Sequence, residues 1–501
     1  MKNTMKKYIR IVLSAVLCLS LVLPGFVTTA QAVGALPGEK VTSNVTVDQN
    51  FADNRVLVVL TREASMTFTT YTANSFASLG CVSVTDLSDA TGAMVKAAME
   101  QAMETFSSRG ISDLPSTPVE HSETISNYRQ VLCLELNEAS KENVIETIKL
   151  LSERDDVLYA GPDYMMELRS DEPVSATEVV SEIDNYELAV VSSVTPNDPD
   201  YSQQWGAETI SLPEAWGITT GSSNVTVGVI DTGIDGDHPD LINNVSVSLS
   251  RGFYNGYVES FPSVTDTDII PGRGHGTQVA GVIGAQGNNN IGVAGVCWDV
   301  TLVSLNVFGT SGVTYSSRVA LAINYATSVG IDVLNFSAGW CTDDSYYATH
   351  YDLPLNTVIG NYTGVFVCAI DNSSTNYDEE SIIDYPAYYR LYNMITVGAV
   401  MENNHIYGAY GSTIVSLFAP GYDIYTTENG GGYDDTLGTS VAAPYVTGVI
   451  ALMLSVNPDL SIEEIKGMIL DNVDVVDSLS GCCVAGGIIN ARIAVYAASI
   501  T

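Results

Sequence analysis

The stretch Val225-Thr-Val-Gly-Val-Ile-Asp-Thr-Gly233 decides the fold of the larger part of this chain. Its apolar, β-branched run from Val225 to Ile230 is typical of a strand that is buried on both faces of a sheet. The run ends at Asp231, and functional groups in parallel sheets gather at the carboxyl ends of the strands. The stretch therefore predicts a buried strand that presents Asp231 at one edge of a parallel sheet.

Similar apolar runs recur further along the chain and alternate with helical patterns. The other predicted strands are 301–307, 331–336, 364–369 and 394–399, and the predicted helices are 277–285, 315–329, 440–455 and 461–471. This alternation predicts an α/β fold, in which a mostly parallel sheet is flanked by helices on both faces.

Two further segments supply functional groups that could act together with Asp231. They are Gly274-His-Gly-Thr-Gln-Val-Ala-Gly281 and Gly438-Thr-Ser-Val-Ala-Ala-Pro444. Taken alone, Ser440 fits a helix N-cap and His275 fits a structural histidine. Together with Asp231 they supply a hydroxyl nucleophile, an imidazole base and an orienting carboxylate, which favours nucleophilic catalysis.

The order and the amino-acid sequences of these motifs resemble those of subtilisin-like serine proteases. The resemblance covers nearly all of the predicted peptidase domain, residues 196–501: it begins at Asn197-Asp-Pro-Asp-Tyr201 and ends at Gly487-Ile-Ile-Asn-Ala-Arg492. It implies a peptidase domain in which Ser440 is the nucleophile, His275 the general base and then acid, and Asp231 the residue that orients His275. No cofactor for catalysis is implied.

The resemblance also implies a fourth catalytic residue, Asn372. It stands in Ala369-Ile-Asp-Asn372, where the family usually has Ala-Ala-Gly-Asn. The family's asparagine donates a hydrogen bond to the oxyanion. The alternative is an asparagine in an ordinary turn.

Two segments are expected to bind substrate. Ser337, Ala338 and Gly339 resemble the family's Ser-Leu-Gly segment, whose backbone pairs with extended substrate. Asp384 precedes Tyr385-Pro386, and the residue at this place lines the base of the family's specificity pocket. A carboxylate there predicts a preference for Lys or Arg before the scissile bond. The alternative is that Asp384 faces solvent in an acidic loop.

Residues 33–169 predict a separate small α+β unit. Strands are predicted at 55–60, 130–136 and 156–160, and an amphipathic helix at 140–153. This pattern ahead of the peptidase region resembles the family's propeptide, which assists folding and inhibits the enzyme until it is removed. Because the family cuts itself a few residues past the final propeptide strand, the resemblance implies self-cleavage between Arg169, the only basic residue close by, and Ser170. A generic ferredoxin-like binding domain is the alternative.

This unit is flanked by a targeting segment on its N-terminal side and a linker on its C-terminal side. Residues 1–32 combine early Lys and Arg residues, an apolar run and Ala30-Gln-Ala32, which is typical of a secretory signal peptide. Residues 170–195 contain many acids and predict an exposed linker. We therefore expect a secreted, extracellular protein. Secretion permits disulfides, but the seven cysteines left after signal removal leave at least one thiol unpaired.

Net charge and hydropathy restrict the classes of partner that this chain is expected to bind. The chain has 20 Lys and Arg against 58 Asp and Glu, a formal net charge of −38. This charge argues against nucleic acid and anionic membrane surfaces as partners. The apolar run 441–456 contains Pro444 and Gly448 and is better interpreted as a buried helix than as a membrane span. The expected partners are protein or peptide substrates and the chain's own propeptide.

A structural calcium site is also implied by the resemblance. The loop Asn288-Asn-Asn-Ile-Gly-Val-Ala-Gly295 resembles a calcium-binding loop of the family. The residues at the matching positions are Asp240, Gly287, Asn289, Ile291 and Val293, and such oxygen-rich ligation suits Ca²⁺.

The sequence thus predicts a self-processing serine endopeptidase, with two alternatives. One is a catalytically silent domain of the same fold that serves as a binding module. The other is a dedicated processing protease that matures one partner, as opposed to a broad scavenger. The residues do not separate these last two.

Overall fold

The structure is a computed structural model that describes residues 45–47, 49–97, 128–168, 192–254, 261–268, 274–343, 353–379 and 382–501. The predicted signal peptide and residues 170–191 of the predicted linker lie outside the described residues. The chain divides into two compact units. Unit 1 holds residues up to Asp163 together with Ile323–Gly330 and Asp352–Tyr362, and unit 2 holds the rest.

Unit 1 combines strands and helices, but it ends at Asp163 and includes two later segments, so a separate domain over residues 33–169 stays a prediction. The strands of unit 1 are β1 (Phe51–Leu60), β2 (Cys81–Asp86), β3 (Val131–Leu136) and the first part of β4 (Val157–Leu168), in the order β4-β1-β3-β2. Helix α5 (Lys141–Ser152) begins where the Ser140 hydroxyl accepts a hydrogen bond from the Asn143 N–H and packs on β1. Helix α11 (Leu353–Asn361) also packs on β1, and α2 (Arg62–Ser65) is a single turn.

Strand β4 is much longer than predicted. The sequence predicts a strand that ends near Ala160, but β4 continues through Pro162 to Leu168. Its last residues, which belong to unit 2, pair antiparallel with β9 (Val313–Tyr315) on one side and β11 (Ala338–Asp343) on the other. The extension is therefore stabilised by strand pairing with residues far away in the sequence, which local pattern does not reveal.

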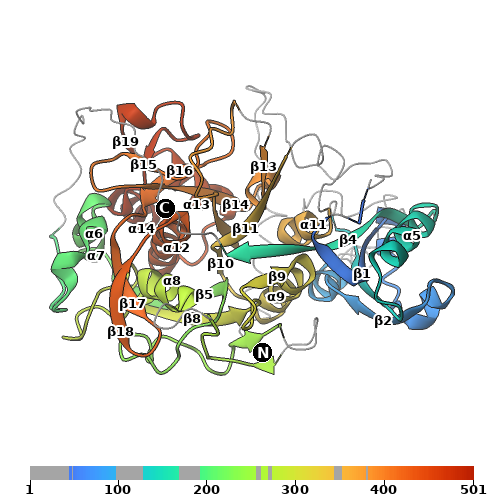
Figure 1. Cartoon of the computed structure of the whole chain (residues 1–501). Helices are drawn as coiled ribbons and strands as arrows, with labels where there is room; N and C mark the ends of the chain where they lie inside the picture. The colour runs from blue at the N-terminus through green and yellow to red at the C-terminus, as the bar shows by residue number, and fades with distance from the viewer. Residues whose placement is uncertain are drawn as a thin grey trace, which may run out of the picture. The chain divides into compact units, whose positions relative to one another are not determined.

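Unit 2 is built around the predicted parallel sheet (Figure 1). Strands β16, β14, β12, β10, β5 and β8 are neighbours in that order, and all five pairs are parallel. They are β5 (Gly221–Asp231), β8 (Asp299–Asn306), β10 (Val333–Phe336), β12 (Val365–Ala369), β14 (Met394–Val400) and β16 (Leu417–Pro420). Their buried, β-branched side chains explain the correct prediction of five of them.

Shorter strands extend or accompany this sheet. They are β6 (Arg251–Gly252), β7 (Phe261–Pro262), β15 (Ile406–Tyr407), β19 (Asp474–Val475) and β20 (Gly487–Ile488). Strand β13 (Ile382–Tyr385) pairs antiparallel with β11, and β17 (Ile424–Glu428) and β18 (Gly432–Thr436) form a hairpin.

The helices of unit 2 place the candidate residues. They are α6 (Trp205–Thr209), α7 (Leu212–Trp216), α8 (His275–Gly284), α12 (Thr439–Val456), α13 (Ile462–Leu470) and α14 (Ala491–Ile500); α9 (Ser316–Val329) begins in unit 2 and ends in unit 1. Helix α12 is long and apolar enough to cross a membrane, but it is almost wholly buried against β5, β10, β12 and β14. The prediction of a buried helix here is confirmed.

Within the described part of the chain, the cysteines form no disulfide. All seven that follow the predicted signal peptide lie in the described residues, and each is a free thiol. The cysteine side chains in the cores are therefore packing residues, as non-disulfide cysteines often are.

Candidate active site

Asp231 is the last residue of β5 and is fully buried between the neighbouring strands β8 and β10. Its carboxylate oxygen Oδ1 accepts a hydrogen bond from the Thr232 N–H at 2.7 Å. The prediction that this residue stands at the carboxyl edge of the sheet is confirmed. The edge position leaves its carboxylate facing the loops that follow the strands.

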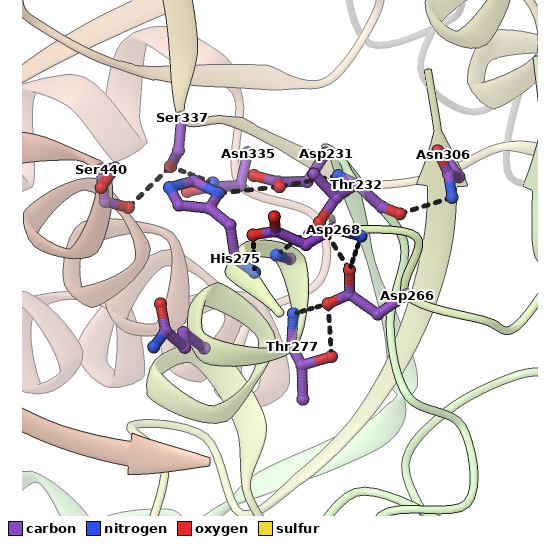
Figure 2. Close-up of polar contacts among 12 residues, drawn as sticks. Asp231, Thr232, Asp266, Asp268, His275, Thr277, Asn306, Asn335, Ser337 and Ser440 are labelled. Carbon is purple, nitrogen blue, oxygen red and sulfur yellow. Dashed lines mark hydrogen bonds and ion pairs between the residues drawn. The ribbon is translucent and has the colours of Figure 1, made fainter. Parts of the chain in front are cut away.

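His275 is the first residue of α8 and is also buried. It follows Gly274, whose φ of +61° suits a residue without a side chain. The Nδ1 atom of His275 lies 2.8 Å from Asp231 Oδ1 (Figure 2). This contact fixes the ring and aims its Nε2 edge away from Asp231.

Ser440 is the second residue of α12. Among the described residues its Oγ has no hydrogen-bond partner, although it is buried. Its carbonyl oxygen accepts a hydrogen bond from Ser337 Oγ at 2.7 Å, and Ser337 Oγ in turn accepts one from Asn335 Nδ2 at 2.9 Å. In the view of Figure 2, Ser440 and Asp231 lie on opposite sides of the His275 ring.

Asn372 follows β12 and reaches the start of α12. Its Oδ1 accepts hydrogen bonds from the N–H and the Oγ1 of Thr439, each at 2.8 Å. A Cβ atom at Gly438 would lie 2.9 Å from Ser440 Oγ and 3.2 Å from Asn372 Nδ2. The amide nitrogen and the Ser440 hydroxyl therefore border the same small space, which only glycine at position 438 leaves open.

Asp266 is a buried carboxylate that the sequence analysis did not identify. It bonds to residues close to Asp231 and His275 in the sequence. Its Oδ1 accepts hydrogen bonds from Thr232 Oγ1 and the Asp268 N–H, and its Oδ2 accepts from the N–H and Oγ1 of Thr277 (Figure 2). Burial raises the pKa of Asp266, whereas the hydrogen bonds from Thr277, Asp268 and Thr232 oppose that shift. Since all four contacts are donated to it, the carboxylate form fits this site.

The hydrogen bonds around Asp266 connect the end of β5, which carries Asp231, to the start of α8, which carries His275. Thr232 directly follows Asp231, and its hydroxyl accepts the Gly276 N–H at 2.9 Å. The Thr277 hydroxyl accepts the Asp235 N–H at 2.9 Å. The signal that could have revealed Asp266 is a cluster of acids before a helix N-terminus.

Asp384 lies in β13 and is fully buried. Its Oδ2 accepts the Asp371 N–H at 2.9 Å, and Cys341 Sγ lies 3.7 Å from its Oδ1. Burial, and then the charge of Asp384, raise the pKa of the nearby Tyr377 hydroxyl. The alternative in which Asp384 faces solvent is therefore wrong.

Ala338 and Gly339 begin β11, directly after Ser337. Their backbones pair with the end of β4, Ala338 opposite Leu168 and Gly339 opposite Glu167. Met165, Met166 and Glu167 pair with β9 on the other side. An extended segment of this same chain thus occupies a three-stranded antiparallel arrangement that leads toward Ser337.

The predicted calcium residues are brought together only in part. Asp240 accepts hydrogen bonds from the Val293 N–H at 3.0 Å and from Asn289 Nδ2 at 2.7 Å, while Asn289 Oδ1 accepts the Ile291 N–H. The Asn289 amide therefore presents nitrogen to the carboxylate, whereas the resemblance implied its oxygen as a ligand. Gly287 packs against Trp298.

A second carboxylate near this loop was missed by sequence reasoning. Asp198 is buried and accepts the N–H groups of Asn288 and Asn289. Burial is the main cause that raises the pKa of Asp240, and the charge of Asp198 adds to it. Two buried carboxylates beside this loop supply the oxygen donors that Ca²⁺ prefers. Among the described residues, however, no group of three or more His, Cys, Asp or Glu side chains is placed to hold a metal ion, and the Asn289 amide presents its nitrogen to Asp240.

Comparisons with known proteins identify the family to which this chain belongs. The family model described as the subtilase family matches residues 222–486. Thermitase of Thermoactinomyces vulgaris is 33% identical over 308 residues, which cover 60% of this chain and 99% of thermitase. Subtilisin DY of Bacillus licheniformis is 35% identical over 246 residues, which cover 49% of this chain and 81% of that protein.

Solved structures give the same result for the fold. A protease from Pseudoalteromonas arctica has a TM-score of 0.51 at 28% identity and covers 61% of this chain and 100% of its own. Fervidolysin from Fervidobacterium pennivorans, a keratinolytic enzyme related to subtilisin, has a TM-score of 0.60 at 22% identity. That match covers 93% of this chain and 64% of fervidolysin, and it concerns the fold alone.

Proposed function

This chain belongs to the subtilase family and is a subtilisin-like serine endopeptidase, and we propose that Ser440, His275 and Asp231 are its catalytic triad. The observation that carries the proposal is the buried 2.8 Å contact between His275 Nδ1 and Asp231, together with a Ser440 Oγ that lacks a described partner.

In this mechanism Ser440 Oγ attacks the carbonyl carbon of the scissile peptide bond. His275 Nε2 takes the hydroxyl proton, and the imidazolium that forms is stabilised by the Asp231 carboxylate at Nδ1. His275 then returns the proton to the leaving amine. Water hydrolyses the acyl-enzyme by the same steps, with Ser440 as the leaving group.

The negative charge on the carbonyl oxygen would be held by two N–H donors. One is the Ser440 backbone N–H at the N-terminus of α12, and the other is Asn372 Nδ2. Thr439 anchors Oδ1 of the same amide, so the donor is held in place before the reaction begins. Preorganisation of this kind lowers the barrier because little reorganisation is needed in the transition state.

The first experiment compares the wild type with Ser440→Ala. A fluorophosphonate probe should label the wild type and not the variant, and kcat should fall by about 10⁵-fold or more. Labelling of the variant would contradict the assignment of Ser440. No labelling of a folded wild type would favour the alternative of a catalytically silent binding module.

We extend the proposal to the residue before the scissile bond, for which Lys or Arg is expected. A buried carboxylate, Asp384, lies on β13 next to β11, where Ala338 and Gly339 pair with an extended segment. A basic side chain that enters here would gain a charge-assisted hydrogen bond with little competition from water. Such a preference is compatible with both a processing protease and a scavenger.

Residues 33–169 are proposed to be an inhibitory propeptide. The register of β4 supports this, because Leu168 lies opposite Ala338, which directly follows Ser337 in the sequence; Arg169 and Ser170, at the predicted cut, lie outside the described residues. The predicted cut between Arg169 and Ser170 would then use the same Asp384 preference.

The processing proposal is tested by N-terminal sequencing of the mature protein. Wild type should begin at Ser170 or close to it, whereas Ser440→Ala should retain residues before Arg169. If both proteins are cut alike, another protease removes the segment. Sequencing also tests export, because a signal peptide that ends at Ala32 should be missing from both proteins.

A structural calcium ion completes the proposal. Asp240, Asp198 and the Asn289 side chain would hold it, with carbonyl groups of the loop 287–293. Calcium would neutralise two carboxylates that are buried beside one loop and would tie that loop to Asp198, near the start of the predicted peptidase domain. It would have no part in the chemical step.

A further inference from the structure

The side chain of Trp340 lies in β11, directly after the segment that pairs with β4. Its ring stacks on Tyr164 of β4, with centroids 6.3 Å apart and an interplanar angle of 21°, and on Tyr385 of β13, at 4.7 Å and 26°. Tyr164 and Tyr385 are almost fully buried, and Trp340 is partly exposed. The three rings form a continuous aromatic cluster at the side of the β4 strand.

The strand register explains why these rings meet. Since Gly339 is opposite Glu167, the next pair along the antiparallel strands is Trp340 and Met166, and Tyr164 is the diagonal neighbour on the same face. Met166 is fully buried in this position. The register therefore sets Trp340 beside Met166 on the same face, and its indole stacks on Tyr164, two residues along the strand.

From this arrangement we propose that Trp340 and Tyr385 form a subsite for an aromatic side chain at the sixth residue before the scissile bond. The proposal rests on the proposed function, in which the end of β4 occupies the substrate strand and the cut follows Arg169. Counted back from Arg169, Tyr164 is the sixth residue. When β4 leaves, the ring face of Trp340 that Tyr164 covers becomes available to a substrate.

Two features point to substrate as the occupant of this ring face. The Trp340 Nε1 atom has no hydrogen-bond partner among the described residues even with β4 in place, so this donor is left for an acceptor that a substrate other than β4 would supply. Tyr385 packs further against Tyr389, with ring centroids 5.1 Å apart, so two buried rings support Trp340 from below. The subsite binds only peptides that extend at least six residues before the scissile bond. Shorter peptides do not reach it.

The test uses the processed enzyme and two matched fluorogenic peptides. Both have Arg before the scissile bond, and they differ only at the sixth residue before it, which is Tyr or Ala. We expect wild type to prefer the Tyr peptide by about three- to tenfold in kcat/KM, the range that aromatic pairs contribute. Trp340→Ala should reduce this ratio to about one, and Trp340→Phe should keep most of it.

The ratio separates this inference from the proposed function, because each enzyme serves as its own reference. Trp205→Phe is a control at a tryptophan whose Nε1 bonds to Tyr422 and Asp423 carbonyls, and it should leave the ratio unchanged. Equal rates for the two peptides in wild type, with cleavage after Arg intact, overturn the subsite alone. Loss of the Arg preference with the Tyr preference intact overturns only the role of Asp384.

A second test needs no activity and uses the full chain with Ser440→Ala. In this background Tyr164→Ala and Trp340→Ala should each lower Tm, and the double variant should lower it by clearly less than the sum. Tyr164→Phe, which keeps the ring, should have little effect. Additive shifts would mean that the two rings do not interact, and the subsite would lose its basis.

Discussion

Asn372 shows how much a single side chain depends on its neighbours. Thr439 holds one end of its amide with two hydrogen bonds, so the other end is fixed beside Ser440. We expect Asn372→Leu to lower kcat by about 10²–10³-fold with little change in KM, because the lost hydrogen bond forms mainly in the transition state. Steady-state kinetics on a chromogenic peptide would measure this.

The matched control for Asn372 is Asn403→Leu, at an exposed turn residue that accepts the His405 N–H. It should leave kcat unchanged. A kcat of Asn372→Leu close to wild type would show that the oxyanion is held by other donors.

Asp384 is the residue on which substrate choice depends. Asp384→Asn keeps an acceptor for the Asp371 N–H and removes the charge. We expect the preference for Arg over Phe before the scissile bond to fall by about 10- to 100-fold, because a charge-assisted hydrogen bond is replaced by a neutral one. A peptide library that varies only this residue would measure the preference.

Asp378→Asn is the control for Asp384, since Asp378 lies in the same acidic segment but is exposed. Its library profile should match wild type. If Asp384→Asn also matches wild type, the buried carboxylate serves the packing of β13 and does not select substrate.

At the scale of elements, the important junction joins the end of β5 to the start of α8. Asp266 receives four hydrogen bonds there, two of them from Thr277 in the first turn of the helix. We expect Asp266→Asn to lower the free energy of unfolding by about 1–3 kcal/mol, because an amide N–H would face groups that also donate. The variant should also lose about tenfold or more in kcat, since small displacements of His275 slow the reaction.

Thermal unfolding and kinetics of Asp266→Asn would be compared with Asp237→Asn, an exposed carboxylate just after β5. The control should stay within about 0.5 kcal/mol of wild type. Loss of stability without loss of kcat in Asp266→Asn would mean that α8 keeps His275 in place without this carboxylate.

At the scale of the whole molecule, the excess of acidic residues makes bound cations important. The chain has a formal net charge of −38, and Asp198 and Asp240 are buried beside one loop. At a calcium concentration about 100 times Kd, binding would add about 2.7 kcal/mol to the stability. We expect EGTA to lower Tm by about 5 °C or more, as scanning calorimetry would show.

The calcium response should disappear in Asp240→Asn and persist in Asp459→Asn, an exposed carboxylate before α13. An identical Tm with and without EGTA in wild type would contradict the calcium proposal. The variant pair distinguishes this site from general screening of the acidic surface by Ca²⁺.

Local sequence patterns predict the α/β fold, five strands of the parallel sheet, the helices α8, α9, α12 and α13, the unit 1 elements β1, β3, α5 and the first part of β4, and the three motifs around Asp231, His275 and Ser440. These depend on local periodicity and on residue types that only a few chemistries require. Tertiary structure alone decided the extension of β4 to Leu168, the burial of Asp384, the Asp266 junction and the stacking of Tyr164 on Trp340. Each of these arises from contacts between residues far apart in the chain, whose energies come from strand pairing, burial and hydrogen bonding that no local pattern records.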